Sequence, residues 1–327
     1  GLIGNLINEG SIISSSVFGL WNNGRVLFLN NAGTLSGSSG IYQAQGASMD
    51  ILINTGTIRG DGFNGAGIYF EPDAVSPVRI TELINDGGTI EGTAPGAKGI
   101  YMGGQGDSSI GTLLTSGTIR GDQYAIYAHD SLSVIGELGI YGNDTARFHG
   151  EVYARSATMR VRQNATYTFR PADVFTVNAF NNEGTVKFEN NPNPYNFFTF
   201  TNGFTNNGTV ELAAGQTVSI AGTFHQGAAG KLRFNLTNNT DYGRLIVSDL
   251  VSLPSNAHFE VNVADPNFAF TTTQMSDVVV VQNPSLLLWD GTGTVADNSA
   301  LFDFQAVLDG DTIDLRLVAA GGSGGGG

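Results

Sequence analysis

Short segments in which apolar and polar residues alternate recur along the chain, each close to a turn-forming glycine. Ile53–Gly60 reads I-N-T-G-T-I-R-G and Leu114–Gly121 reads L-T-S-G-T-I-R-G, and looser copies occupy residues 7–12, 31–37, 84–92, 182–186 and 207–210. Gly10, Gly33 and Gly56 follow one another at intervals of 23 residues. A period of roughly 20–50 residues is typical of solenoids, propellers and arrays. Because each copy is too short to bury its own apolar face, we expect successive copies to stack.

Each repeat contains two further apolar segments. One is a Gly-Ile-Tyr triplet or a close variant, at residues 40–42, 67–69, 99–101 and 125–127, and the other precedes the next copy, at residues 26–29, 51–53, 80–84 and 110–114. Three short strands in each repeat predict an all-β fold, a right-handed parallel β-helix. Side chains alternate along a strand, so one row should stack inside (Ile58, Ile90, Ile119) and its neighbours should point outward (Thr57, Thr89, Thr118).

Some repeats carry insertions rich in Gly, Pro and Asp, at residues 61–66, 71–77, 93–98 and 103–109. Such clusters indicate loops that leave the coil. In solenoids, loops inserted into individual repeats often form the binding face. We therefore expect attachment, if present, to use the corner loops of the first five coils.

The pattern divides the chain into a β-helix repeat region, residues 1–215, a C-terminal capping region of the same helix, residues 216–320, and a Gly/Ser linker or tag, residues 321–327. Within the cap, Phe302–Val318 predicts a hairpin, because Asp309-Gly310 between alternating strands is a strong turn signal. A cap is needed because the last coil of a solenoid otherwise exposes an unpaired strand edge. Of the 20 phenylalanines, 15 lie at position 169 or later, which predicts a bulkier interior there.

Composition excludes several classes of function. The 327 residues carry a formal net charge of −14, which disfavours binding to nucleic acid or to anionic lipid. There is no cysteine, so disulfides do not stabilise the fold. No window approaches 18 apolar residues, the length that a membrane-spanning helix requires. The first residues, Gly1-Leu2-Ile3, look like the middle of a coil, so we expect a mature or trimmed fragment.

The C-terminal third resembles the end of a pertactin-like passenger domain of bacterial autotransporters (type V secretion). The matching segments are Gly230–Phe234, Asp241–Val247, Phe302–Phe304 and Asp309–Leu315, and the Asn-x-Gly-Thr-Ile repeats are similar to coils of the same family. The resemblance implies a cap that acts like an autochaperone. It also implies a location at the bacterial cell surface (outer membrane) or in the secreted fraction, with membrane contact only through a C-terminal β-barrel that this chain lacks.

Parallel β-helices also include polysaccharide lyases and hydrolases, which need clustered carboxylates. The acidic residues here are spread out and lie mostly at turns, among them Asp50, Glu71, Glu91, Asp107 and Asp130. The four histidines, at positions 129, 149, 225 and 258, show no spacing typical of a triad or a metal site. We therefore expect no catalytic residue, no cofactor and no metal, while an enzyme on this scaffold remains the alternative.

Two sets of residues are candidates for binding. Arg-Gly-Asp occurs twice, at Arg59, Gly60, Asp61 and at Arg120, Gly121, Asp122. It is either a turn copied with its repeat or an integrin-type adhesive loop. Four tyrosines of the repeated triplet should form an outer row, which either stabilises the coils or offers a carbohydrate platform: Tyr42, Tyr69, Tyr101 and Tyr127.

The sequence thus predicts an adhesin that binds a host cell-surface protein or glycan, or another copy of itself. A lyase or hydrolase, and a non-catalytic stalk for a missing N-terminal head, remain alternatives.

Overall fold

The computed structural model describes residues 1–128, 131–170, 173–189, 196–200, 202–283 and 285–319. His129, Asp130 and the predicted Gly/Ser tail lie outside the described residues. The described chain is all-β: it contains strands, turns and loops, and no helix in it is long and apolar enough to cross a membrane.

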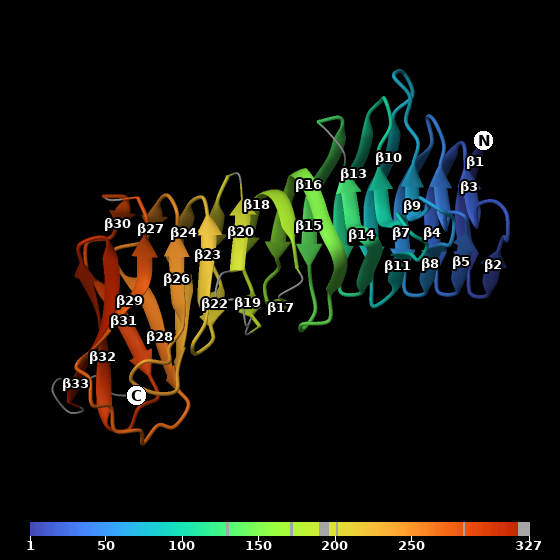
Figure 1. Cartoon of the computed structure of the whole chain (residues 1–327). Coiled ribbons are helices and arrows are strands. Elements are labelled where there is room, and N and C mark those ends of the chain that lie inside the picture. The colour runs from blue at the N-terminus through green and yellow to red at the C-terminus, as the bar shows by residue number, and fades with distance from the viewer. Residues whose placement is uncertain (129–130, 171–172, 190–195, 201, 284, 320–327) are drawn as a thin grey trace. The chain divides into compact units, whose positions relative to one another are not determined.

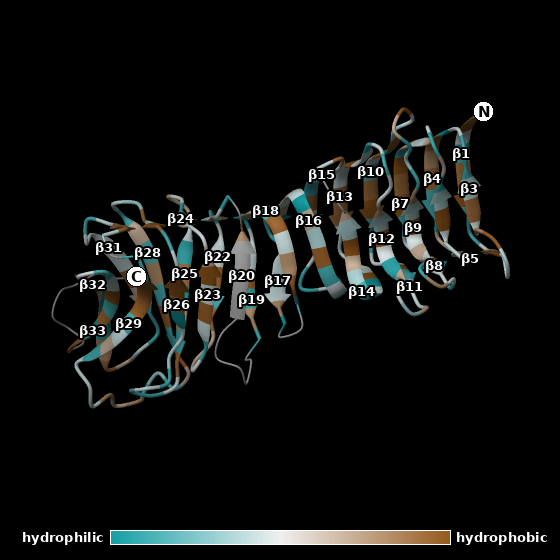
Figure 2. Cartoon of the chain, turned by 45° about the horizontal axis from the view of Figure 1, so that its top comes forward, coloured by the Kyte–Doolittle hydropathy of each residue, from teal (hydrophilic) through white to brown (hydrophobic). Residues whose placement is uncertain are grey.

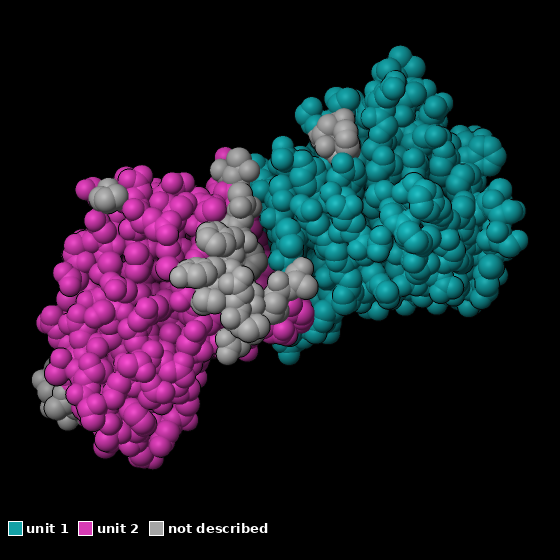
Figure 3. Space-filling view, viewed as in Figure 1, with its two compact units in different colours: residues 1–167, 172–178 teal, residues 168–171, 179–327 magenta. Residues whose placement is uncertain are grey.

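The chain forms two compact units (Figure 3). Unit 1 comprises Gly1–Tyr167 and Ala172–Asn178, and unit 2 comprises Thr168–Pro171 and Ala179–Gly327. Strands β17 (Thr166–Phe169) and β18 (Phe175–Asn182) contribute residues to both units. The predicted boundary between residues 215 and 216 falls within unit 2, so a separate capping region stays a prediction.

Unit 1 is built from rows of parallel strands that pair in register from one repeat to the next (Figure 1). The first row runs through β1 (Leu2–Asn8), β4 (Arg25–Asn31), β7 (Ser48–Asn54), β10 (Val78–Asn85), β13 (Ser108–Thr115) and β15 (Ser133–Ile140). The second runs through β2 (Ser11–Ile13), β5 (Thr34–Gly37), β8 (Thr57–Gly60), β11 (Thr89–Gly92) and the start of β14 (Thr118–Ala128). The third runs through β3 (Leu20–Asn22), β6 (Ile41–Gln43), β9 (Ala66–Phe70), β12 (Lys98–Met102), the end of β14, and β16 (Arg147–Val161).

Aliphatic side chains stack inside these rows. Ile58 lies in register with Ile90, and Ile90 with Ile119, and all three are fully buried, as predicted. Thr57, Thr89 and Thr118 on the same strands are partly exposed, which confirms their outward direction. Figure 2 shows the apolar stretches of β4, β7, β10 and β13 side by side. The long parallel sheets with repeat-spaced strands are consistent with a β-helix.

Buried asparagines form a second internal row, which the sequence analysis did not anticipate. The side-chain amide of Asn8 donates to Asn31 at 2.7 Å, that of Asn31 to Asn54 at 2.8 Å, and that of Asn54 to Asn85 at 2.8 Å. Each amide also donates to a backbone carbonyl in the next coil, at 3.1–3.2 Å. The row ends at Thr115, whose hydroxyl accepts from Asn85 at 3.3 Å.

Unit 2 repeats the same plan with its own rows. One row pairs β19 (Thr185–Phe188), β22 (Thr209–Leu212), β25 (Lys231–Leu236), β28 (Ala257–Val263) and β31 (Gly293–Asp297). A second pairs β20 (Asn196–Phe200), β23 (Thr217–Ala221), β26 (Arg244–Val247) and β29 (Gln274–Val281). The third continues from the end of β18 through β21 (Phe204–Asn206), β24 (Phe224–Gln226), β27 (Val251–Ser252) and β30 (Leu287–Leu288).

Aromatic rings fill much of the interior of unit 2. Phe180, Phe204 and Phe224 stack in succession, with ring centroids 4.7 and 5.4 Å apart, and all three are buried. Pairs of this kind contribute about 0.5–1.5 kcal/mol beyond the area they bury. This arrangement confirms the predicted bulkier interior.

An antiparallel hairpin closes one edge of unit 2. Strands β32 (Phe302–Asp309) and β33 (Thr312–Ala319) pair around Gly310, whose φ of +62° suits glycine, and this confirms the predicted hairpin. Strand β33 also pairs antiparallel with β29, which has β26 on its other side. The hairpin therefore satisfies backbone groups that a last parallel strand would leave unpaired.

We predict that Asn54→Ala lowers the free energy of unfolding of unit 1 by about 2 kcal/mol, because it removes the buried amide oxygen that accepts from Asn31 and the buried amide N–H that donates to the side-chain oxygen of Asn85. Urea denaturation measures the loss, and hydrogen exchange localises it to unit 1. The matched control is Asn30→Ala, which removes a partly exposed amide next to the row. Equal effects of the two substitutions would contradict a special role for the buried row.

Candidate binding surface

Six aromatic side chains form a continuous row along one face of unit 1, hereafter the tyrosine face. Each ring contacts the ring of the neighbouring coil, with centroids 4.0, 5.3, 4.9, 5.9 and 5.6 Å apart in the order Phe18, Tyr42, Tyr69, Tyr101, Tyr127, Tyr153. All six are partly exposed. The four tyrosines singled out from the sequence thus come together, as predicted.

The register of the strands puts these rings on the outer face. In the Gly-Ile-Tyr triplet the isoleucine is buried, so the tyrosine that follows it points the other way. Ile68 pairs with Ile100 while Tyr69 pairs with Tyr101. Since parallel strands place similar triplets side by side, ring contacts recur from coil to coil, some stacked and some tilted.

Polar neighbours surround the rings. The phenol of Tyr42 donates a hydrogen bond to the carboxylate of Glu71, and the ammonium of Lys98 lies 5.2 Å from the centroid of Tyr101. Burial raises the pKa of Tyr42, Tyr69 and Tyr101. The phenols therefore stay neutral at physiological pH and act only as hydrogen-bonding groups.

One end of the tyrosine face widens into an open depression of about 470 Å³, hereafter the Trp21 depression. It is lined by residues of three successive coils: Phe18, Trp21, Asn23, Tyr42, Ala44, Gln45 and Glu71. Phe18, Trp21 and Tyr153 were not among the binding residues predicted from the sequence. A signal for Trp21 was present, because Gly19-Leu20-Trp21 is a variant of the Gly-Ile-Tyr triplet, and Trp21 pairs in register with Tyr42.

The first Arg-Gly-Asp segment is held by its own neighbours. The carboxylate of Asp61 accepts hydrogen bonds from the hydroxyls of Ser36 at 2.9 Å and Thr93 at 2.8 Å, and forms an ion pair with Arg59 at 2.9 Å. Gly60 is buried, and a Cβ there would lie 2.2 Å from the carbonyl oxygen of Ala66. The glycine is thus required by close packing, and the carboxylate is occupied.

The second Arg-Gly-Asp segment lies within β14, two coils away from the first, with β11 between them. The carboxylate of Asp122 accepts from the backbone N–H of Gly96 at 2.9 Å. A Cβ on Gly121 would lie 1.9 Å from the carbonyl oxygen of Tyr124. In both segments the glycine is required by close packing and the aspartate bonds to a neighbouring coil. The two segments are separated by the coil that contains β11.

Acidic residues also pair with arginines on the strands of unit 1. Asp50 and Glu91 lie within β7 and β11, so their expected position at turns is wrong. Asp50 forms an ion pair with Arg25 at 2.8 Å, and Glu91 with Arg59 at 3.8 Å. The reason is that in-register strands place opposite charges from neighbouring coils side by side.

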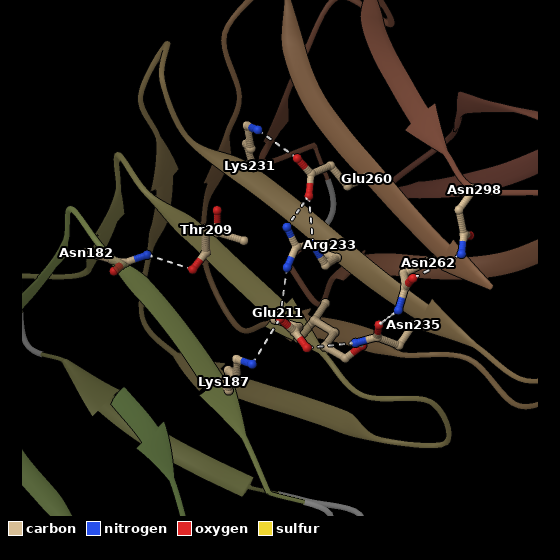
Figure 4. A network of polar contacts seen from close by, with 11 residues as sticks. Asn182, Lys187, Thr209, Glu211, Lys231, Arg233, Asn235, Glu260, Asn262 and Asn298 are labelled. Atoms are coloured by element: carbon tan, nitrogen blue, oxygen red, sulfur yellow. Dashed lines mark hydrogen bonds and ion pairs between the residues drawn. The ribbon is translucent and has the colours of Figure 1, made fainter. Parts of the chain in front are cut away.

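A network of charged and amide side chains covers one face of unit 2 (Figure 4). Arg233 bridges Glu211 at 3.1 Å and Glu260 at 2.7 Å, and Lys231 also binds Glu260 at 2.7 Å. Burial opposes ionisation of Glu260, but the hydrogen bonds from Lys231 and Arg233 outweigh it and lower the pKa of that carboxyl. The carboxylates and cations of β22, β25 and β28 therefore neutralise one another across neighbouring strands.

The network borders an open depression of about 330 Å³ that is also lined by Asp297. Burial raises the pKa of Asp297. The carboxylate of Asp297 accepts hydrogen bonds from the backbone N–H groups of Ser299 at 3.0 Å and Phe304 at 3.3 Å. Each carboxylate that lines this depression therefore has partners on its own or a neighbouring strand or turn.

Within the described residues, no group of three or more His, Asp or Glu side chains is arranged to hold a metal ion. Comparison of the sequence with protein-family models and with curated proteins yields no match.

We predict that the stability of unit 1 falls as the pH rises above about 10. The folded pKa values of the phenols are raised, so the folded state binds more protons in this range than the unfolded state. Their contribution is complete below about pH 10, the usual pKa of tyrosine, and is lost as the pH rises through the folded values. Absorbance at 295 nm, followed together with circular dichroism, measures ionisation and unfolding.

The control for this titration is Tyr101→Phe, which keeps the stacked ring and removes one phenol. It should make the loss of stability with pH shallower. Phenols that ionise at the same pH in folded and urea-denatured protein would contradict the expected linkage.

Proposed function

We propose that this chain is a surface-exposed or secreted autotransporter passenger, folded as a right-handed parallel β-helix, that acts as an adhesin through the tyrosine face of unit 1. The observation that supports this most directly is the row of six partly exposed aromatic rings in contact with one another. Aromatic residues are enriched at binding interfaces because they offer a large, amphipathic contact area.

The tyrosine face is also preorganised. Tyr42, Tyr69, Tyr101 and Tyr127 each contact a ring of the coil before and a ring of the coil after, so a partner that binds there orders few side chains. Low ordering cost raises affinity for a given contact area. The partner on this proposal is a host cell-surface protein or glycan. The net charge of −14 argues against nucleic acid.

The passenger assignment rests on the resemblance of the C-terminal segments, among them Gly230–Phe234 and Asp241–Val247. It is supported by the hairpin that pairs with β29, because an end cap of this kind suits a solenoid that must remain soluble. Such a passenger is located at the bacterial cell surface or is secreted.

Self-association is a second candidate function. Asn235, Asn262 and Asn298 form an amide row on unit 2, in which Asn262 and Asn298 are exposed. An exposed amide offers both a donor and an acceptor to the same amide of another copy. Because two copies each carry −14, self-association of this kind should strengthen as salt rises.

We predict that the double substitution Tyr69→Ser with Tyr101→Ser reduces attachment of the purified chain to host cells by at least about tenfold, a loss of about 1.4 kcal/mol. Bound protein is quantified by flow cytometry, and circular dichroism verifies the fold. The matched control is Tyr69→Phe with Tyr101→Phe, which keeps the rings and should retain attachment. Undiminished attachment of a folded serine variant would overturn the assignment of the tyrosine face.

We predict that Asp61→Ala with Asp122→Ala leaves attachment within about twofold and lowers the free energy of unfolding by about 1 kcal/mol, because exposed but hydrogen-bonded carboxylates are lost. The same cell assay and a urea titration measure the two effects. Loss of attachment by a fully folded variant would instead support the integrin-type interpretation of the two Arg-Gly-Asp segments.

A further inference from the structure

We propose that the Trp21 depression is a binding subsite for a neutral saccharide. This inference rests on the proposed adhesive function and names the chemistry of the ligand at one place on the tyrosine face. The depression combines three aromatic rings with three hydrogen-bonding side chains in one open site: Phe18, Trp21 and Tyr42, with Asn23, Gln45 and Glu71.

The indole of Trp21 is exposed to solvent. Trp21 lies on β3, the first strand of its row, and is 63% exposed, as are other large apolar residues of the first coil such as Ile13 at 68%, whereas its register partner Tyr42 is only partly exposed. Tyr42 is held on one side by Phe18, with ring centroids 4.0 Å apart, and on the other by Tyr69 at 5.3 Å. Trp21 therefore presents an apolar surface beside rings that are fixed in place.

The polar side chains supply matched hydrogen-bonding groups. Asn23 and Gln45 are exposed amides, each with a donor and an acceptor. The carboxylate of Glu71 is oriented by the hydrogen bond that it accepts from the phenol of Tyr42, and its remaining lone pairs can accept from a ligand. The depression thus offers both acceptors and donors within reach of the aromatic surface.

This combination suits a sugar ring. A pyranose has an apolar face of C–H groups, which stacks on an aromatic ring, and a rim of hydroxyls, which both donate and accept hydrogen bonds. A proline-rich peptide also docks on aromatic grooves, but it lacks the hydroxyls that would satisfy three polar side chains. The volume of about 470 Å³ lies within the usual range of small-molecule sites.

The charge of the site restricts the class of saccharide. Glu71 is the one ionisable side chain with a formal charge at neutral pH among the lining residues, and no lysine or arginine accompanies it there. A sialylated or sulfated glycan would meet this carboxylate and the net charge of −14, so anionic sugars are disfavoured. The site is open, so a single sugar should bind weakly, with a Kd on the order of 1 mM, and a cell surface with many copies would raise the avidity.

The test uses the full chain and defined probes: methyl glycosides of galactose, glucose and mannose, with sialyllactose as the anionic probe and a proline-rich peptide as the competing class. The chain has two tryptophans, and Trp289 is buried in unit 2. Trp289→Phe therefore isolates the fluorescence of Trp21, and saturation-transfer NMR provides an independent readout of binding.

We expect at least one neutral glycoside to perturb Trp21 fluorescence and to give a saturation-transfer signal. Trp21→Ala should weaken binding at least tenfold, and Glu71→Ala should weaken it more than Glu71→Gln, which keeps an acceptor. The matched control is Phe63→Ala, which removes an aromatic ring that is 79% exposed on the same unit and should leave binding unchanged.

Binding of none of the neutral probes, binding of sialyllactose or the peptide alone, or unchanged binding by Trp21→Ala would each overturn the saccharide site. Cell attachment measured in parallel separates this inference from the adhesive function. If the unsubstituted chain attaches to cells but binds no neutral sugar, the saccharide site is overturned and the adhesive function is retained. If it binds a neutral sugar but does not attach, the saccharide site is supported and the adhesive function is overturned. If it does neither, both proposals are overturned.

Discussion

The buried amide row is the interaction on which the arrangement of unit 1 depends. Asn31, Asn54 and Asn85 are fully buried, and each amide donates both to the next side chain of the row, which is an amide or finally the hydroxyl of Thr115, and to a backbone carbonyl of the next coil. Burial of an amide without partners is costly, so these bonds are made in one register only. A slip of one residue would turn every amide outward and every neighbouring side chain inward. Unit 2 uses the same device, since Asn182 donates to Asn206 at 2.8 Å.

This register decides the chemistry of the surface. Once the coils are aligned, the tyrosine that follows each buried isoleucine must meet the tyrosine of the next coil. The outer face therefore presents the same side chain in successive coils. A different side chain appears there only where the sequence of one coil differs from the repeat. Trp21 is such a departure, because it places an indole where the later coils have a phenol. Phe18 then stacks on Tyr42 from outside the repeated triplet.

Most of the carboxylates whose contacts are described serve the scaffold. Asp50, Glu91, Glu211 and Glu260 each pair with a cation on a neighbouring strand, and Asp61 accepts from two hydroxyls. A carboxylate that is occupied in this way is a poor nucleophile or general base, because its partner stabilises the charge that it would have to share. This use of the acids supports the proposed binding function over the alternative of a hydrolase. Glu71 differs, since its described partner is a single phenol beside an open depression.

The sequence by itself determined the repeat, the alternation and the turns. The interval of 23 residues and the alternating Thr-Ile pairs were sufficient to predict stacked strands with Ile58, Ile90 and Ile119 inside, and Asp309-Gly310 was sufficient to predict the hairpin. These features depend on local backbone preferences and on the period of the apolar residues, and both can be read directly from the amino-acid sequence.

The partners of polar side chains were decided only by the tertiary structure. Asparagine recurs two residues before Gly10, Gly33 and Gly56, but only the structure shows that these side chains are buried and bond between coils. Likewise, Asp61 meets Ser36 and Thr93 because coils with insertions of different length still align their strands. Insertions change the sequence separation of two residues but not the spacing of their strands. Which residues face one another across coils is therefore a property of the stacked structure, and so is the depression around Trp21.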